Sequence, residues 1–206
     1  IKKLKNYLII FLKMPKTAVL IGFGGMGKRY YKALGLMRIK TIAICEKNLK
    51  ATSSLKFKKD LLITDNYTKL LNTKADLLCI ASNTKSRYKI LTAFFKKGKI
   101  KRFITEKPLS TSYQDCLAIE KIVKKKNLRI LVNTHRSYSP NFIMIKEIFK
   151  KYNEKPNTIF INSPSAGLGN MGSTFFDLGF FFLNEKAKSV IGGIDKTGTI
   201  SPRGKQ

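Results

Sequence analysis

Three glycines near the start of the chain have the spacing of a phosphate-binding loop. The segment from Thr17 to Gly27, TAVLIGFGGMG, places them in the order G-x-G-x-x-G directly after a short apolar run. In a strand-turn-helix unit, the first glycine makes the tight turn, the second lets a pyrophosphate approach the backbone, and the third lets the helix pack on the strand. The helix N-terminus then offers its N–H groups to the phosphates. The loop residues that we expect to bind a dinucleotide are Gly22, Phe23, Gly24, Gly25, Met26 and Gly27.

An acidic residue follows the second apolar run of the chain. Residues 41–45, TIAIC, lead into Glu46, which comes 19 residues after Gly27. A dinucleotide-binding unit places at this distance the carboxylate that holds the adenosine ribose hydroxyls. Each feature alone has an ordinary explanation, a βαβ turn for the glycines and a solvated strand end for Glu46, so the prediction depends on their spacing. We predict NAD as the cofactor, with NADP as the alternative, because a carboxylate repels the 2′-phosphate of NADP.

Other polar residues follow the later apolar runs. In an open parallel sheet, ligands bind beyond the carboxyl ends of the strands, so these positions are candidates for the same site. Ser82, Asn83 and Thr84 offer hydroxyl and amide groups to a cofactor, although a role as helix N-caps accounts for them nearly as well. Glu106 and Lys107 precede a proline that fixes the backbone, and this context distinguishes Lys107 from the many other basic residues of the chain.

The elements that must position these residues alternate along the chain. Short apolar runs predict strands, and the segments between them predict helices. After the first strand, the expected strands are 39–45, 61–64, 76–81, 102–105 and 128–132, and the expected helices are 28–36, 84–97, 112–126 and 140–152. Such alternation indicates an α/β fold with a doubly wound, right-handed parallel sheet. We assign this domain to residues 14–134.

The pattern changes after residue 155. Residues 158–162 have the composition of a strand, residues 167–172 are rich in glycine, and residues 174–183 are strongly apolar. The apolar stretch is too short for a membrane span and is interrupted by Asp177, so we expect a buried helix. We assign residues 135–206 to the start of a second domain.

The N-terminus and the composition narrow the class of protein further. Residues 1–13 contain an apolar run too short to cross a membrane, and Met14 directly precedes the first strand, so we interpret 1–13 as an extension that is not native; a basic membrane-surface anchor is the alternative. The formal net charge is +29, but the basic residues are spread along the chain without a nucleic-acid-binding motif. We therefore expect lysine-rich, solvated helix faces, with no specific nucleic acid and no membrane as partners. The three cysteines lack C-x-x-C spacing and there is one histidine, so we expect no metal site and a cytoplasmic location.

Several motifs taken together resemble one enzyme family. They are AVLIGFGGMGKRYYKAL, Glu46, DLLCIASNTKSRYKIL, ITEKPLS at 104–110, LVNTHRSYSPNF at 131–142 and GNMGSTFFDL at 169–178. The combination resembles the glucose-fructose oxidoreductase, inositol dehydrogenase and rhizopine catabolism family, Gfo/Idh/MocA, from about Met14 to the end of the chain. E-K-P at this distance from the glycines, followed by R-x-Y-x-P, is more specific than the glycine motif alone.

The resemblance implies a fold and an activity. The fold is an N-terminal Rossmann domain and a C-terminal α/β domain with a mostly antiparallel sheet, of which this chain would hold an incomplete part, because family members are generally much longer. The activity is that of an NAD(P)-dependent dehydrogenase or reductase acting on CH–OH groups of sugars, cyclitols or their derivatives in carbohydrate metabolism. The lysine of E-K-P, the family's catalytic or substrate-orienting residue, corresponds to Lys107, and the full-length protein would be a homo-oligomer.

The second domain departs from the family pattern. The motif D-x-G-x-H-x-x-D falls on Asn170, Gly172, Thr174 and Asp177, so that threonine stands in place of the histidine. Another register places Asp177 on the first aspartate and Phe181 on the histidine. A threonine cannot act as an imidazole base, which puts the usual proton transfer in doubt. The candidate catalytic residues are Lys107, Asn170, Thr174 and Asp177, and the alternative function is a catalytically degraded dinucleotide-binding protein with a sensing or scaffolding role.

Overall fold

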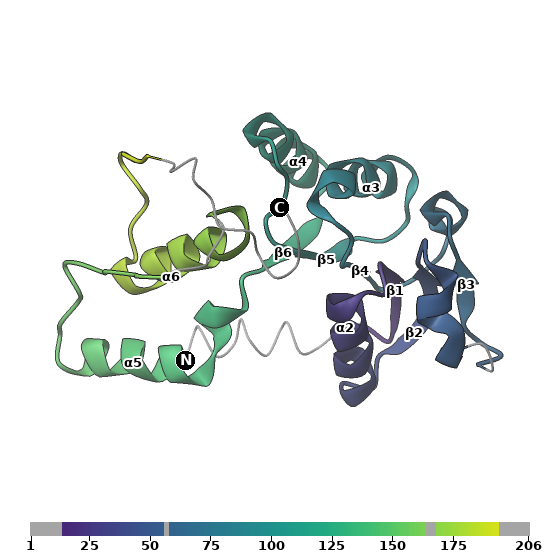
Figure 1. Ribbon diagram of the computed structural model, residues 1–206, viewed down its shortest axis with the longest axis horizontal. Helices are drawn as coiled ribbons and strands as arrows, with labels where there is room; N and C mark the ends of the chain where they lie inside the picture. The colour runs from purple at the N-terminus through teal and green to yellow at the C-terminus, as the bar shows by residue number, and fades with distance from the viewer. Residues whose placement is uncertain (1–13, 56–57, 164–167, 194–206) are drawn as a thin grey trace. The chain divides into compact units, whose positions relative to one another are not determined.

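The chain forms two compact units, Ile1–Asn133 and Thr134–Gln206 (Figure 1). The structure is a computed structural model that describes residues 14–55, 58–163 and 168–193, without the side chains of Leu168 and Asn170. The expected extension, residues 1–13, lies outside the described residues. The two units are therefore described one at a time.

The first unit is built on a six-stranded parallel sheet with the order β3-β2-β1-β4-β5-β6. Its strands are β1 (Thr17–Ile21), β2 (Lys40–Cys45), β3 (Leu62–Thr64), β4 (Leu77–Ile80), β5 (Arg102–Glu106) and β6 (Arg129–Asn133). The doubly wound sheet predicted from the apolar runs is confirmed, with each strand within a residue or two of its expected bounds. The strand order reverses between β1 and β4, which is where ligands bind in such folds.

Helices cover both faces of this sheet, because successive strand residues point to opposite sides. On one face, Val19 and Ile21 pack with residues of α3 (Thr84–Lys97) and α4 (Tyr113–Lys125). On the other face, Ala18 and Leu20 pack with Leu34 of α2 (Gly25–Leu36). The 3-10 helices Leu49–Leu55 and Tyr67–Leu70 complete the connections around β3.

The second unit is helical in its described part. It contains a 3-10 turn (His135–Tyr138), α5 (Pro140–Lys151), a π-helical turn (Leu168–Gly172) and α6 (Ser173–Leu183). The two long helices contact each other through aromatic rings, with ring centroids 6.0 Å apart for Phe142 and Phe182. The helix expected at 174–183 is confirmed, but it is only partly buried: Thr174 and Leu178 are enclosed, whereas Phe176 and Phe180 are about half exposed.

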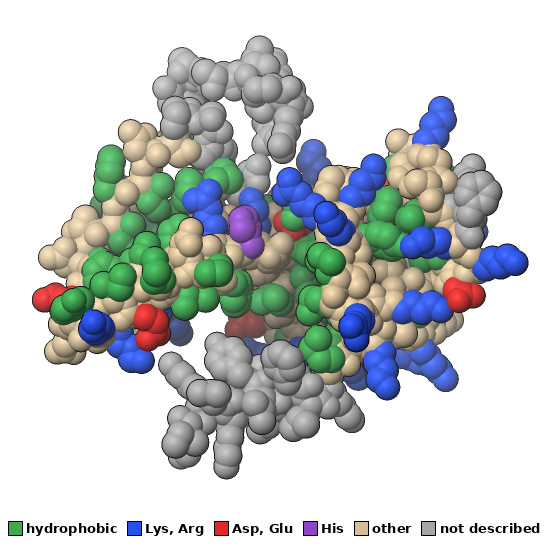
Figure 2. All heavy atoms as spheres, turned by 90° about the horizontal axis from the view of Figure 1, so that it is seen from below, with side chains coloured by type: hydrophobic (Ala, Val, Ile, Leu, Met, Phe, Trp, Pro, Cys, Tyr) green, Lys and Arg blue, Asp and Glu red, His purple; other side chains and the backbone are tan. Residues whose placement is uncertain are grey.

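The prediction of a strand at 158–162 is wrong. The antiparallel sheet implied by the family resemblance is not present in the described residues of the second unit. Residues 158–162 have no regular structure, and Phe160 is 87% exposed. The physical reason is that an apolar run forms a strand only when a neighbouring strand accepts its backbone hydrogen bonds. Figure 2 shows many hydrophobic side chains at the surface of this unit, while Lys and Arg side chains are spread over the first unit. Within the described ranges, no helix is both long and apolar enough to cross a membrane.

Candidate functional site

The glycine loop leaves no room for larger residues at two of its positions. Gly22, which follows β1, has a φ of +91°, and a Cβ there would lie 2.9 Å from the carbonyl carbon of Ala81. A Cβ on Gly27 would lie 2.0 Å from the carbonyl oxygen of Gly22. The first glycine thus allows the turn beside the end of β4, and the last allows α2 to pack against that turn. These are the roles that the motif requires.

The middle of the loop is open, as a phosphate site requires. Gly24 caps the N-terminus of α2, and in the described part of the chain a Cβ built on Gly24 or Gly25 meets nothing within 4 Å beyond its chain neighbours and the backbone of its own helix. The first N–H groups of a helix lack intrahelical acceptors, and the first turn of α2 has no acidic residue to repel an anion. Phe23 can contribute only through its backbone, because its side chain is buried and packs edge-on against Tyr31. The loop therefore fits a pyrophosphate.

Glu46 lies beside this loop, directly after β2. Its Oε2 accepts the backbone N–H of Phe23 at 2.5 Å, and its Oε1 accepts the backbone N–H of Asn48 at 2.9 Å. Each carboxylate oxygen has a second lone pair, so these bonds orient the group and leave it able to accept ribose hydroxyls. The carboxylate predicted from spacing alone is thus fixed next to the glycine motif.

A buried cluster underlies the ends of β5 and β6. Glu106, 8% exposed, accepts two hydrogen bonds at its Oε1, from the Tyr30 hydroxyl at 2.6 Å and from Nδ2 of Asn133 at 2.8 Å. Burial and the neighbouring carboxylate raise the pKa of Tyr30 well above its ordinary value, so Tyr30 remains a donor. Glu106 is expected to bind the cofactor; in the structure its Oε1 accepts two protein donors, and the cofactor role stays a prediction.

Arg87 belongs to the same region and is not among the site residues predicted from the sequence. It is 2% exposed, and its guanidinium donates to the carbonyl oxygen of Ser82 at 2.8 Å and to that of Pro108. Burial lowers its pKa, and the charge of Glu106 opposes that effect. A signal was available, because Arg87 precedes Ile90, Leu91 and Phe94 at helical spacing, on the apolar stripe of α3.

The turn after β4 has the geometry of a helix cap. Oδ1 of Asn83 accepts the backbone N–H of Ser86 at 3.0 Å, and Thr84 is the first residue of α3. The capping role weighed against cofactor binding is therefore present. The Ser82 hydroxyl donates to the carbonyl oxygen of Asn83 at 3.4 Å, so towards a ligand it would act as an acceptor.

Lys107 directly follows β5, and its peptide bond to Pro108 is cis. The other candidate catalytic residues belong to the second unit. Thr174 is 1% exposed, and among the described residues neither its Oγ1 nor Oδ2 of Asp177 has a hydrogen-bond partner. These two residues are three apart on α6 and so share a face of the helix. The Asn170 side chain lies outside the described residues, and Phe181 packs against Phe182 with ring centroids 5.2 Å apart.

Neither of the two buried thiols in the first unit is a candidate nucleophile. Burial raises the pKa of Cys45 to about 11 and that of Cys79 to about 12, so both are protonated near neutral pH. Cys116, like Cys45 and Cys79, forms no disulfide within the described residues, and burial raises the pKa of its thiol as well.

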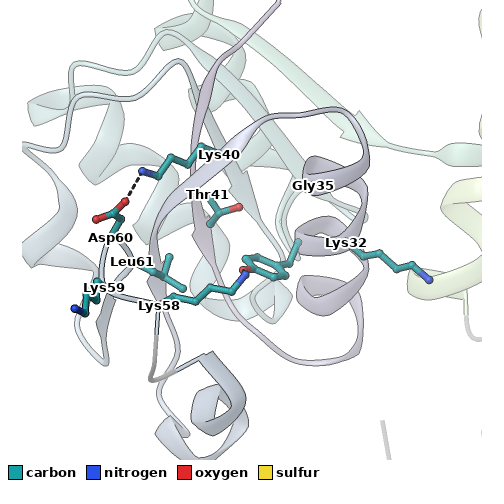
Figure 3. A pocket seen from close by; sticks show the side chains of 9 residues that line it. Lys32, Gly35, Lys40, Thr41, Lys58, Lys59, Asp60 and Leu61 are labelled. Carbon is teal, nitrogen blue, oxygen red and sulfur yellow. Dashed lines mark hydrogen bonds and ion pairs between the residues drawn. The ribbon is translucent and has the colours of Figure 1, made fainter.

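A cavity of about 650 Å³ lies away from these residues, where β2 and β3 begin (Figure 3). Its lining includes Lys40 and Asp60, whose side chains form an ion pair at 2.9 Å, and Tyr31, whose hydroxyl accepts from Lys58 at 2.7 Å. The glycine loop lies at the carboxyl ends of the strands, so this cavity is not part of the dinucleotide site.

Comparisons with known proteins agree with this geometry. A family model described as "Oxidoreductase family, NAD-binding Rossmann fold" (GFO_IDH_MocA) matches residues 16–134, more than half of the chain. A search of curated proteins finds no match.

Three solved structures illustrate the similarity in fold. An NAD-binding protein from Listeria innocua is 22% identical, with a TM-score of 0.67 over 82% of this chain and 55% of that one. The myo-inositol 2-dehydrogenase from Lactobacillus plantarum is 19% identical, with a TM-score of 0.70 over 83% and 57%. The WlbA dehydrogenase from Bordetella pertussis, solved with NADH and UDP-GlcNAcA, is 16% identical, with a TM-score of 0.65 over 81% and 59%. The chain thus spans 55 to 59% of the length of these structures.

Proposed function

The chain belongs to the Gfo/Idh/MocA family of oxidoreductases with an NAD-binding Rossmann fold, and on that premise we propose that it transfers a hydride to or from a CH–OH group of a sugar, a cyclitol or a sugar derivative. One observation carries the proposal. The Glu46 carboxylate accepts the N–H of Phe23 inside an open glycine loop. The loop lies at the carboxyl ends of the central strands, where the strand order reverses. This arrangement provides a phosphate site and a ribose acceptor side by side.

Different residues of the first unit bind different parts of NAD. Within the Gly22–Gly27 loop, the backbone N–H groups at the start of α2 bind the pyrophosphate, because those of Gly22 and Phe23 already donate to Cys45 and Glu46. Glu46 accepts the ribose hydroxyls. Ser82 and Thr84, on the other side of the strand-order reversal, contact the remaining half of the cofactor. When bound, NAD accepts or supplies the hydride.

Lys107 is proposed as the group that acts on the substrate oxygen. Its ammonium donates a hydrogen bond to that oxygen and stabilises the charge that develops as a hydroxyl becomes a carbonyl. Glu106, fixed by Tyr30 and Asn133, holds the backbone from which Lys107 projects.

Thr174, Asp177 and Asn170 are proposed as substrate-binding residues from the family motif. The unpartnered Oγ1 of Thr174 and Oδ2 of Asp177 support this, because buried polar atoms without partners are uncommon and are satisfied by a bound hydroxyl. Asp177 is then the carboxylate that can take a proton in place of the missing histidine.

The substrate class rests on similarity of fold. One similar structure is a myo-inositol 2-dehydrogenase, and another was solved with UDP-GlcNAcA, so polyols and sugar nucleotides are the first compounds to test. We also propose a homo-oligomeric assembly and a cytoplasmic location for the protein.

The second candidate function is a dinucleotide-binding protein that has lost catalysis. Thr174 favours it, because a threonine hydroxyl does not change its protonation state near neutral pH and so cannot act as a base, whereas an imidazole can. The lysine of the E-K-P motif, Lys107, favours the enzyme.

The test is a screen of cyclitols, sugars and sugar nucleotides with NAD, read as NADH absorbance, on the wild type, Lys107→Met and the exposed control Lys99→Met. We expect turnover with at least one compound and a loss of about 10² to 10⁴ in Lys107→Met, the usual contribution of a positioned acid or base. NADH affinity should be nearly unchanged in both variants. NADH binding without turnover of any compound would favour the second candidate.

A further inference from the structure

Arg87 is a charged side chain in a place that normally holds an apolar one. It lies on the apolar stripe of α3 and is 2% exposed. Burying a charge is costly unless it is paired and hydrogen-bonded. A buried guanidinium therefore needs hydrogen-bond acceptors and a compensating negative charge.

Its partners are backbone carbonyls of two different turns. One is Ser82, in the turn between β4 and α3, and the other is Pro108, in the turn between β5 and α4. The buried carboxylate of Glu106, at the end of β5, compensates the positive charge. One side chain thus joins the two turns that follow adjacent strands.

Both turns lie on the same side of the strand-order reversal. Glu46 and β2 lie on the other side, with the ribose acceptor. Because a dinucleotide lies across the reversal, the adenosine half belongs beside Glu46 and the nicotinamide half belongs beside the turns that Arg87 joins.

We propose that Arg87 is a positioning residue that sets the nicotinamide half of the site, by fixing the Ser82–Thr84 turn against Lys107 and Pro108. The inference rests on the proposed function. A lysine cannot replace it, because an ammonium is a point donor, whereas the planar guanidinium presents several donors in fixed directions and reaches both carbonyls together.

The test compares two ligands that share the adenosine half. Kd values for NADH and for ADP-ribose are measured on the wild type, on Arg87→Lys and on Arg129→Lys, a control at the exposed start of β6. We expect Arg87→Lys to raise the Kd for NADH about tenfold and to change the Kd for ADP-ribose by less than about twofold. The reason is that only the nicotinamide half of the site loses its support. Hydrogen exchange should become faster in residues 82–84 and 107–109 of this variant.

Each other outcome has a defined meaning. An equal rise in the Kd for both ligands, or no change in either Kd, overturns the positioning role. If Arg87→Lys is unfolded at the working temperature, Arg87→Gln carries the same comparison, because it keeps a donor without burying a charge. Loss of folding in both variants also overturns the proposal, since the residue would then serve the core. Failure of the wild type to bind NADH contradicts the proposed function instead.

Discussion

The hydroxyl of Tyr30 donates to Oε1 of Glu106 at 2.6 Å, which ties the helix after the glycine loop to the residue before Lys107. Asn133 donates to the same oxygen from the end of β6. The proposed phosphate site and the proposed catalytic lysine are therefore connected through one buried carboxylate within one unit of the chain.

This hydrogen bond predicts a loss of stability in Tyr30→Phe. The variant keeps the ring but removes one donor to a buried carboxylate, so the free energy of unfolding should fall by about 1.5 to 3 kcal/mol. Tyr113→Phe, at a tyrosine that is 71% exposed, is the matched control and should change it by less than about 0.5 kcal/mol. Chemical denaturation measures both. Equal effects would show that the Tyr30 hydroxyl contributes nothing specific.

Two glycines of the same helix should respond in opposite directions to alanine. A Cβ on Gly27 would lie 2.0 Å from the carbonyl oxygen of Gly22, whereas a Cβ on Gly35 meets no described atom within 4 Å outside its neighbours and its own helix backbone. Gly35→Ala should therefore raise the free energy of unfolding by about 0.5 to 1 kcal/mol, and Gly27→Ala should lower it by about 1 to 3 kcal/mol. Thermal melting of the pair checks this. A stabilised Gly27→Ala would contradict the close contact between α2 and the turn.

The sequence specified most of the first unit because its local signals agree with the fold. The expected helix 84–97 is found with the same bounds, since Asn83 caps its start and Gly98 ends it. The strands of the sheet were recognisable as short apolar runs between helices. Glu46 and the glycines were identifiable by spacing, because the fold fixes the distance between them.

The remainder depends on contacts that one segment does not encode. Residues 158–162 resemble a strand in composition, but pairing needs a partner strand from elsewhere. Arg87 was missed because an arginine in a lysine-rich helix resembles surface charge, although its place on the apolar stripe of α3 indicates burial. The two carbonyls that it reaches lie in turns outside its own helix, and the pattern of that helix does not encode them. The roles of Lys107, Thr174 and Asp177 stay predictions.

Glu46 should determine the choice between NADH and NADPH. Glu46→Gln removes the charge that repels a 2′-phosphate and weakens the acceptor of the ribose hydroxyls, so NADH affinity should fall about tenfold and the preference over NADPH should shrink. Glu154→Gln, an exposed position in the second unit, serves as the control. Titration with both reduced cofactors measures the ratio. Tighter NADPH binding by the wild type would contradict the assignment of Glu46.

Asp76 should make stability depend on pH in the acid range. Its Oδ2 accepts the backbone N–H groups of Lys16 and Thr17 at 2.8 and 3.0 Å, and these bonds lower its pKa. A lowered pKa in the folded state stabilises the protein above the unfolded value of about 3.9, and this contribution is lost as the pH falls through the folded value. Between about pH 5 and pH 2, the stability of Asp76→Asn should therefore fall less steeply than that of the wild type. Asp65→Asn, an exposed control, should follow the wild type, and identical slopes for all three would contradict the prediction.

Titration of the wild type and Gly24→Ala with NADH tests whether the glycine loop after β1 binds the cofactor. The chain has no tryptophan, so binding is followed by the emission of NADH itself. Among the residues that the structure describes, a Cβ on Gly24 meets nothing within 4 Å beyond its chain neighbours, so the variant should melt at the wild-type temperature. Any loss of affinity then reports on a ligand that approaches the loop. We expect saturable NADH binding by the wild type and an affinity at least about tenfold weaker in Gly24→Ala. No binding by the wild type, or equal affinity in the two proteins, would contradict it.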